Sequence, residues 1–327
     1  MILVRNYVNG TFVESKETIE DINPATSEVI ATIPRSNSDD VNEAVSAADK
    51  ALDNWGTLSL DERRKWLEKI ANALEARSRE IANLESLDTG KPIKIARAVD
   101  ASRSVANFRF FAEFSKDFQE EKFLMEDAIN HVIFKPVGIA GLITPWNLPL
   151  YLLSWKIAPA IVMGNTVVAK PSELTPLTAN LLAEVLDEVG LPSGVVNIVH
   201  GFGHETGQAI TSHPKVDLIS FTGGTATGKK VAETAAPMFK KLSLELGGKN
   251  ATIVLDDVDL DSAIPEIARS GFLNQGQVCL CGSRILVSDK IWNDFLEKFV
   301  SHVSKMKVGD PSSDDSDLGA LVSLSHR

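Results

Sequence analysis

Cysteine is scarce in this chain: only Cys279 and Cys281 among its 327 residues carry a thiol. A small secreted protein held together by disulfides needs more cysteines than that, so this class is excluded. A bridge between two cysteines only two positions apart would also be strained. The N-terminus shows neither a long apolar stretch nor the cleavage pattern of a secretory signal. We therefore expect a reduced, cytoplasmic protein.

Positively charged residues are fewer than negatively charged ones. The chain has 33 Lys and Arg against 44 Asp and Glu, which gives a formal net charge of −11. Such a chain is repelled by the phosphates of nucleic acids and by anionic lipid surfaces. We therefore expect no nucleic acid and no membrane among its partners.

One apolar segment imitates a membrane span. Lys156 is the only charged residue between positions 137 and 163. Pro145, Pro149 and Pro159 interrupt this segment, and in lipid the broken backbone would leave polar groups without hydrogen bonds. The sequence therefore predicts a buried strand, a loop and a helix in the core of a soluble protein.

Helical periodicity dominates the N-terminal region. A helix capped by Ser38 is predicted over residues 39–52. A second helix has its capping-box spacing at Ser59 and ends at Gly90, and a third covers residues 93–118.

Strands and helices then alternate, which predicts an α/β fold with a doubly wound parallel sheet, of the Rossmann-like kind that holds a cofactor. A second, smaller α/β region follows, too thin to form an independent sheet. The predicted strands are residues 139–143, 166–169, 195–199, 218–221, 242–246, 251–255 and 284–287. The predicted helices are residues 148–162, one starting at Pro176 with Thr175 as its cap, 205–211, 226–236, 260–274 and 291–306.

The two thiols allow three interpretations. A free cysteine is most often a buried, unreactive side chain. Cys279 is alternatively a nucleophile, because a thiolate adds readily to a carbonyl carbon. The C-x-C spacing of Cys279 and Cys281 also suits a metal, although the six histidines form no obvious partner set.

A glycine-bearing turn, Gly223-Gly-Thr-Ala-Thr-Gly228-Lys229-Lys230, follows a predicted strand. It approaches the phosphate-binding pattern G-x-x-x-x-G-K-[ST], but Lys230 stands where the magnesium-binding hydroxyl is needed. Hydrolysis of a nucleoside triphosphate is therefore disfavoured. A strand, a glycine turn and a helix start still suit the pyrophosphate of a cofactor.

Two polar residues stand in apolar surroundings. Glu245, between Leu244 and Leu246, is either a paired structural ion or a general base whose surroundings raise its pKa. Asn147 is the only polar side chain of the tight turn at residues 145–149. It either stabilises that turn or donates its amide to an oxyanion.

Taken together, five segments resemble the signature set of the aldehyde dehydrogenase superfamily in order and spacing. They are Pro145-Trp-Asn-Leu-Pro149, Val168-Ala-Lys-Pro-Ser-Glu173, Phe221-Thr-Gly-Gly-Thr225, Leu244-Glu-Leu-Gly-Gly-Lys249 and Gly276-Gln-Val-Cys279. Asp21-Ile-Asn-Pro-Ala-Thr26 and Leu87-Asp-Thr-Gly-Lys-Pro92 resemble its N-terminal landmarks. The likeness covers essentially the whole chain, and the joint specificity is high where each motif alone is weak.

The resemblance implies the catalytic roles. Cys279 adds to an aldehyde to form a thiohemiacetal, whose oxyanion is held by the Asn147 side chain and the Cys279 N–H. Hydride transfer to a nicotinamide leaves a thioester, which water activated by Glu245 hydrolyses. Lys156 is either a buried proton-relay group or a helix lysine that reaches out to water.

The resemblance also implies NAD as the cofactor. Lys170 and Glu173 look like the pair that binds the adenosine ribose hydroxyls, and the carboxylate should repel the 2′-phosphate of NADP. The other cofactor-binding residues that it implies are Trp146, Gly223, Gly224 and Gly247.

Residues 142–159, 241–250 and 278–281 look most like the 2-aminomuconic semialdehyde dehydrogenase branch of the family. That implies a small-molecule substrate, an unsaturated semialdehyde from tryptophan catabolism that carries a carboxylate. Arg109 is the candidate cation for this carboxylate. The alternative is a surface arginine, or one paired with Glu113.

Family members are longer and carry an E-x-F-G-P segment that is absent here, so the chain resembles a C-terminally truncated member. We expect residues 1–245 to form the NAD-binding domain and residues 246–327 an incomplete catalytic domain. Residues 119–136 are expected to belong to an oligomerisation hairpin, although a homo-oligomer is doubtful for so short a chain. We expect weak or no dehydrogenase activity and a tendency to aggregate, and the alternative function is that of a non-catalytic nucleotide-binding or partner-binding fragment.

Overall fold

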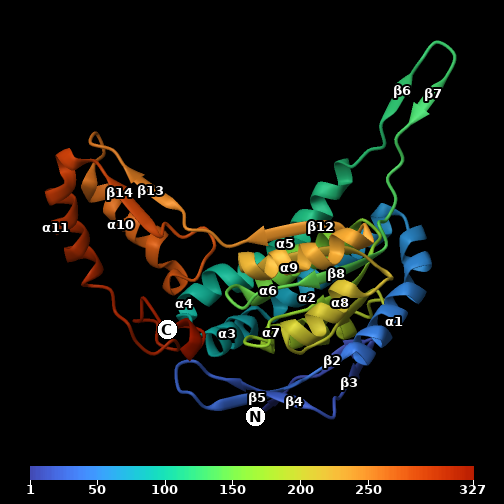
Figure 1. The fold of residues 1–327 in the computed structure, drawn as a ribbon, viewed down its shortest axis with the longest axis horizontal. Coiled ribbons are helices and arrows are strands. Elements are labelled where there is room, and N and C mark those ends of the chain that lie inside the picture. The colour runs from blue at the N-terminus through green and yellow to red at the C-terminus, as the bar shows by residue number, and fades with distance from the viewer.

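The computed structural model describes residues 1–327. Its main element is a seven-stranded sheet with the strand order β12-β11-β8-β9-β10-β2-β3 (Figure 1). The strands from β8 to β12 are parallel, and β2 and β3 extend the sheet in antiparallel pairing. The predicted doubly wound parallel sheet is confirmed. The bounds are β2 Asn6–Val8, β3 Thr11–Val13, β8 Ile139–Ile143, β9 Thr166–Lys170, β10 Val196–Ile198, β11 Val216–Gly223 and β12 Lys241–Leu246.

Helices cover both faces of the central strands. In β8, Ala140 and Leu142 pack into the larger apolar cluster, which includes α2, α5, α6 and α7. Ile139 and Ile143 point the other way, into a cluster with α1, α8 and α9. A parallel strand buried on both sides needs a continuous apolar sequence, which is why β8 and β9 carry no exposed residue. The helix bounds are α1 Ser38–Thr57, α2 Leu60–Ala76, α5 Ser102–Phe114, α6 Pro149–Val162, α7 Leu177–Glu188, α8 Gln208–Ser212 and α9 Thr225–Ala235.

The helix boundaries in the N-terminal region differ in part from the prediction. Asn37, not Ser38, caps α1, because its Oδ1 accepts the N–H of Asp39 at 2.7 Å. The helix expected from Ser59 to Gly90 is broken at Arg77 into α2 and α3 (Ser78–Thr89), since Arg77 leaves helical geometry at ψ 13°.

Two smaller boundaries also change. The third predicted helix is divided into α4 (Ile93–Ile95), a π-helical stretch Ala96–Ala101, α5 and a 3₁₀ turn Ser115–Asp117. Helix α7 begins at Leu177 after Pro176, so Thr175 is not its cap. The cap at Ser59 and the left-handed Gly90 (φ 74°) after α3 are confirmed.

The sequence predicted helices in the N-terminal region but not the strands that precede them. Besides β2 and β3, residues 2–34 form a three-stranded sheet in the order β1-β5-β4. These strands are short and rich in β-branched residues, and half-exposed strands of this length leave little periodicity to detect. Their bounds are β1 Ile2–Leu3, β4 Thr18–Ile22 and β5 Val29–Pro34.

A hairpin of β6 (Lys122–Leu124) and β7 (Ile129–His131) projects from the main body (Figure 1). Its apolar side chains are exposed, with Leu124 at 80% and Ile129 at 59% of their full accessibility. The hairpin lies within residues 119–136, and its role in oligomerisation stays a prediction.

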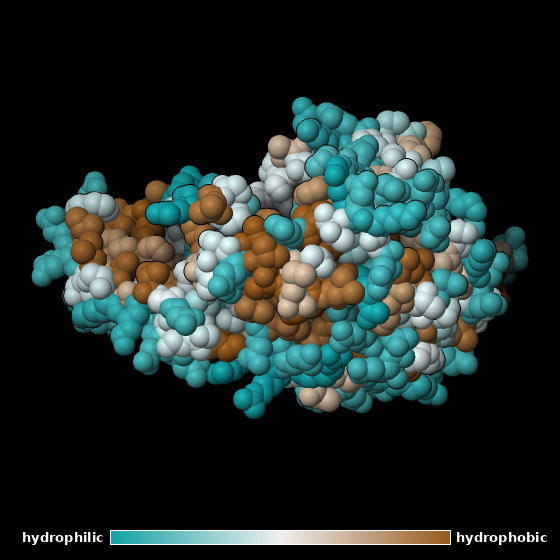
Figure 2. Space-filling view, turned by 90° about the horizontal axis from the view of Figure 1, so that it is seen from below, coloured by the Kyte–Doolittle hydropathy of each residue, from teal (hydrophilic) through white to brown (hydrophobic).

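A separate small unit follows β12. Strands β13 (Ala251–Val254) and β14 (Arg284–Val287) pair in parallel, and α10 (Leu260–Phe272) and α11 (Trp292–Val303) pack beside them. Figure 1 places this unit at the left, connected to the main body by the segment after β12, and Figure 2 shows apolar side chains gathered over it. Leu255 and Leu286 are among its exposed apolar residues.

Residues 310–322, called here the strap, run back from the small unit to the main body. The Ala320 N–H donates to Gly90 O at 2.9 Å, and Lys94 Nζ pairs with Asp317 Oδ1 at 2.7 Å. A Cβ on Gly319 would come within 1.9 Å of the Gly90 carbonyl oxygen, so only glycine fits this crossing.

The apolar segment at residues 137–163 folds as predicted, into β8, a turn and α6. None of the helices combines the length and the apolar character that crossing a bilayer requires.

Four buried carboxyl groups form a connected set with one lysine: Lys91 contacts Glu85 and Asp100, and Asp88 interacts with Glu85 and with Asp21. Lys91 Nζ donates to Asp100 Oδ1 at 2.9 Å and lies 3.8 Å from Glu85 Oε2, with all three side chains fully buried. Burial raises the pKa of Glu85 and of Asp21 to about 7, and it raises the pKa of Asp88 well above its ordinary value. One ammonium cannot compensate four carboxylates, so protons held by these groups stabilise the fold.

This cluster makes stability depend on pH. The folded-state pKa of Asp21, about 7, lies above its ordinary value of 3.8, so its stabilising effect is complete at low pH and is lost as pH rises to about 7. Asp21→Asn removes that loss. We expect the variant's gain in free energy of unfolding over the parent to grow by up to about 1.4 kcal/mol per pH unit in this window and then to level off. Urea unfolding at pH 4.5, 5.5, 6.5 and 7.5 measures the gain, and a gain independent of pH would contradict the expectation.

Candidate active site

The turns that carry the predicted site residues gather at one edge of the main sheet. Asn147 follows β8, Lys170 ends β9, Gly223 ends β11 and Glu245 lies near the end of β12. Since these strands are parallel, their carboxyl ends meet at the same edge, which is where ligands bind in sheets of this kind.

Cys279 lies in an irregular segment between α10 and β14, and its side chain is exposed. Cys281 is buried, so the two thiols differ in access although they are two positions apart. Three left-handed residues precede Cys279, namely Asn274 (φ 53°), Gln275 (φ 58°) and Gly276 (φ 73°). We call residues 274–279 the nucleophile turn.

The structure brings Asn147 into direct contact with the nucleophile turn. Asn147 Nδ2 donates to Gln277 O at 2.9 Å, and Asn274 Nδ2 donates back to Asn147 O at 3.0 Å. The backbone N–H of Cys279 donates to no other group of the protein. A free N–H and a nearby side-chain amide are the two donors that an oxyanion site requires.

Glu245 and Lys156 are placed near each other. Glu245 is exposed on β12, at the edge of the sheet, and is in register with Thr222 of β11. Lys156 on α6 is buried and its Nζ donates to Ser220 Oγ at 2.7 Å, so it does not reach out to water. Burial lowers the pKa of Lys156 to about 8, against the opposing attraction of the Glu245 carboxylate. A lysine with such a pKa can exchange a proton near neutral pH.

A cavity of about 380 Å³ lies beside the start of α9. Glu173, Gly203, Thr227 and Val231 are among its lining residues. No sequence motif pointed to residues 203–211, which contribute Gly203, His204, Gly207, Gln208 and Thr211 to the cavity, because these residues form no recognised pattern.

Lys170 and Glu173, the predicted ribose-binding pair, form an ion pair with each other. Lys170 is fully buried, and its Nζ donates to Glu173 Oε2 at 2.7 Å and to Pro171 O at 2.8 Å. Burial alone would raise the pKa of Glu173, but the charge and the hydrogen bond of Lys170 hold it below its ordinary value. Of the pair, Glu173 lines the cavity and Lys170 holds its carboxylate, and the role of both residues in binding a ribose stays a prediction.

The glycines of the turn after β11 have different surroundings. A Cβ on Gly223 would lie 2.5 Å from the ring of Phe221, whereas a Cβ on Gly224, which caps α9, would meet nothing within 4 Å. Gly247 donates its N–H to Gly223 O at 3.2 Å and thereby ties the end of β12 to this turn. The open surroundings of Gly224 leave the first N–H groups of α9 accessible to an anion.

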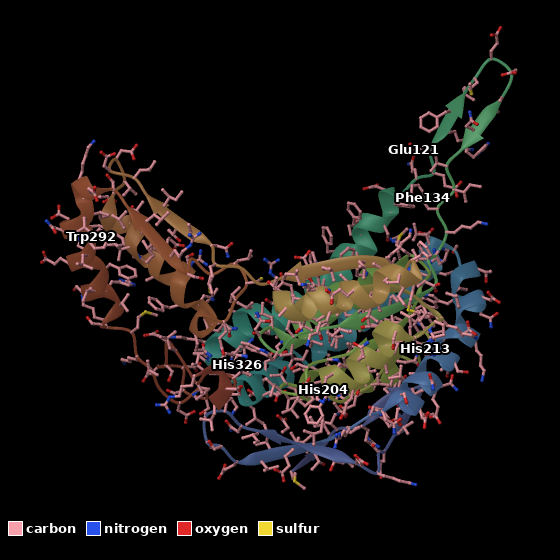
Figure 3. All side chains as sticks on the ribbon, viewed as in Figure 1. Glu121, Phe134, His204, His213, Trp292 and His326 are labelled. Carbon is pink, nitrogen blue, oxygen red and sulfur yellow. The ribbon has the colours of Figure 1, made fainter.

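Trp146 and Arg109 are the remaining predicted site residues. The half-buried Trp146 packs edge-on against His326, with ring centroids 4.5 Å apart; Figure 3 labels His326. Arg109 is exposed on α5, and it bonds Glu75 of α2 at 2.6 and 2.9 Å and Asn72 at 3.2 Å.

Arg109 is a surface arginine, as one alternative predicted, but the predicted pairing with Glu113 is wrong. Its partner is Glu75 and not Glu113, which pairs with Lys116. All its side-chain hydrogen bonds go to α2, so a substrate carboxylate would have to displace Glu75. The sequence could not show this, because Glu75 lies on another helix.

A parallel sheet with a cavity at the carboxyl ends of its strands, and a cysteine turn that contacts an amide, are features of enzymes of the α/β class. Residues 12–327 match the aldehyde dehydrogenase family, and the chain belongs to this family. The predicted resemblance is thereby confirmed, as is the expectation of a dehydrogenase-type enzyme.

The most similar of the relatives compared belong to one branch of this family. The chain is 47% identical to a human 2-aminomuconic semialdehyde dehydrogenase, over 100% of this chain and 67% of the relative, and 48% identical to the zebrafish (Danio rerio) protein of that name, over 99% and 67%. The resemblance to this branch is confirmed. A 2-hydroxymuconic semialdehyde dehydrogenase from Pseudomonas sp. (strain CF600) is 44% identical over 99% of this chain and 68% of the relative.

Solved structures agree. A putative aldehyde dehydrogenase from Burkholderia cenocepacia superposes with a TM-score of 0.97 at 43% identity, and an NAD⁺ complex of aldehyde dehydrogenase from Bacillus cereus with 0.97 at 37% identity. Each match covers 99% of this chain and 67% of the other.

The two glycines after β11 provide a matched pair of variants. Gly223→Ala forces a methyl group against the Phe221 ring and should lower the free energy of unfolding by about 1–3 kcal/mol. Gly224→Ala meets open space at φ −71° and should change it by less than about 0.5 kcal/mol. Urea unfolding of both variants measures the difference, and equal losses would show that the Phe221 contact does not constrain this turn.

Proposed function

We propose that this protein oxidises an aldehyde to the carboxylic acid with NAD, through a covalent intermediate on Cys279. The observation that carries the proposal is the hydrogen bond of 2.9 Å from Asn147 Nδ2 to Gln277 O. It places an amide two residues from the thiol, where the free Cys279 N–H also lies.

The residues of this chain have distinct tasks. The Cys279 thiolate adds to the aldehyde carbon, and the oxygen of the resulting thiohemiacetal becomes an oxyanion between the Asn147 amide and the Cys279 N–H. Bound NAD supplies the acceptor for the hydride that leaves this carbon. Glu245 takes a proton from the water that hydrolyses the thioester, and Lys156 exchanges protons beside it.

Glu173 supports NAD as the cofactor rather than NADP. Its carboxylate lines the cavity beside α9 and is kept ionised by Lys170. A carboxylate accepts hydrogen bonds from ribose hydroxyls and repels a 2′-phosphate. The similar Bacillus cereus structure is described as an NAD⁺ complex, which agrees with this choice.

The names of the relatives support one substrate class. Those with 44–48% identity are named for 2-aminomuconic or 2-hydroxymuconic semialdehyde. We propose an unsaturated semialdehyde with a carboxylate as the substrate. The free state of both thiols suits the reducing cytoplasm as its location. The exposed hairpin β6–β7 suits pairing with a second copy of the chain.

A second candidate function is nucleotide binding without turnover. It is favoured by the exposure of both Cys279 and Glu245, since an exposed thioester and base have no wall that excludes bulk water. The two candidates differ in whether NADH forms.

The first test is a stoichiometric one. Mixing the chain with NAD and an unsaturated semialdehyde should produce at least one NADH per chain, followed at 340 nm. Cys279→Ser should abolish it, whereas Cys281→Ser should retain it because that thiol is buried and does not face the substrate. Absence of NADH from the parent chain, with NAD still bound by fluorescence, would select the second candidate.

The second test concerns the cofactor. Glu173→Gln keeps the shape and removes the charge, and it should weaken NAD binding about tenfold and narrow the preference for NAD over NADP. Glu205→Gln, next to the cavity but not among its lining residues, is the matched control. Titration by protein fluorescence gives both dissociation constants, and an unchanged NAD to NADP ratio in the Glu173 variant would refute this role.

A further inference from the structure

Asn274 has an unfavourable left-handed backbone conformation, which suggests that its side chain has a specific role. It is 4% exposed, has φ 53° and ψ 40°, and opens the run of three left-handed residues before Cys279. Left-handed geometry is unfavourable for residues other than glycine, although asparagine tolerates it better than most. A glycine would adopt this backbone more easily, so the presence of an asparagine side chain at this position needs an explanation.

The Asn274 amide cross-links the two turns of the site. Its Nδ2 donates to Asn147 O at 3.0 Å and to Gln277 O at 3.3 Å. Gln277 O also accepts Nδ2 of Asn147 at 2.9 Å, so both asparagine amides meet on one carbonyl.

Both ends of this arrangement are anchored. Lys91 Nζ donates to Asn147 O at 3.1 Å from a fully buried position, which fixes the Asn147 turn. On the other side, Gln275 Nε2 donates to Ala320 O at 2.9 Å and the Val322 N–H donates to Gln277 Oε1 at 3.1 Å, so the strap holds the nucleophile turn. Asn274 is the side chain that donates across from the nucleophile turn to the Asn147 backbone.

We propose that Asn274 is a positioning residue that fixes the distance between the Asn147 amide and the Cys279 N–H, and so forms the oxyanion site without touching the substrate. This proposal rests on the proposed function. The two oxyanion donors belong to turns that are far apart in the sequence, and displacements of an ångström in such a site are costly to the rate.

Two reactions of Cys279 separate positioning from general reactivity. With p-nitrophenyl acetate, the thiolate adds to the ester carbonyl, an oxyanion forms, and p-nitrophenolate leaves as the carbonyl re-forms in an acetyl thioester. With iodoacetamide, the thiolate displaces iodide at a saturated carbon and no oxyanion forms. The ratio of the two rate constants therefore measures the oxyanion site, and neither reaction requires NAD or hydride transfer.

The variants are chosen to separate the amide from the backbone. Asn274→Gly suits the left-handed backbone and removes the amide, whereas Asn274→Asp keeps the shape and faces two carbonyl oxygens with a carboxylate. Both should lower the ratio of acylation to alkylation by about 10–100-fold, with alkylation changed by less than about threefold. Asn9→Gly relieves a left-handed backbone of the same kind (φ 53°) in the turn between β2 and β3, at the opposite edge of the sheet from β12, so it should keep the parent ratio.

Stopped-flow absorbance at 400 nm gives acylation, and peptide mass spectrometry of Cys279 gives alkylation. An unchanged ratio in Asn274→Gly would overturn the proposal, because the residue would then only accommodate the turn. Loss of the thermal unfolding transition in both variants would also overturn it, and if only one fails to fold the other decides. If the parent chain makes no NADH but the Asn274 variants still lower the ratio of acylation to alkylation, the proposed function is refuted and the role of Asn274 is retained.

Discussion

Burial of the parallel sheet on both faces is the constraint on which the rest of the structure depends. A strand such as β8 has side chains in two separate apolar clusters, one on each side, so it cannot carry charge anywhere along its length. The polar residues that do chemistry are therefore displaced to the ends of the strands. Because the strands are parallel, those ends lie together, and residues from four strands meet at one edge without any of them being near in sequence.

The same constraint explains why the site contains so many buried or half-buried charges. Lys156, within α6, and Lys170, at the end of β9, are both buried; Lys156 donates to Ser220, and Lys170 donates to Glu173 and to the carbonyl of Pro171. An ammonium that has lost its water is sensitive to a single neighbour. Lys170 holds the carboxylate of Glu173, which lines a cavity, and burial lowers the pKa of Lys156 to about 8.

Much of this could be predicted from the sequence, for physical reasons that differ from element to element. The continuous apolar runs of β8 and β9 and the glycine after α3 are local signals, and their positions follow directly from composition and spacing. The motifs around Asn147 and Cys279 indicated a shared chemistry because five weak patterns occur in order. The first 34 residues gave no such signal, since β1 and β2 are too short for periodicity and are stabilised by partners distant in the chain.

The partners of individual side chains were the least predictable. Arg109 pairs with Glu75 of another helix, and the buried ammonium of Lys170 pairs with the Glu173 carboxylate, and only the packing decides such pairs. Nothing in the sequence distinguished Asn274, which is one polar residue among several in the segment before Cys279. Its significance depends on a backbone angle and on a carbonyl oxygen more than a hundred positions away.

The different accessibility of the two sulfur atoms has a practical consequence. One thiol is open to solvent and the other is enclosed, although a single leucine separates them. A bulky electrophile thus finds one target on a folded molecule and two on an unfolded one. The stoichiometry of modification is in this way a count of intact molecules in a preparation, available without any knowledge of substrate or cofactor.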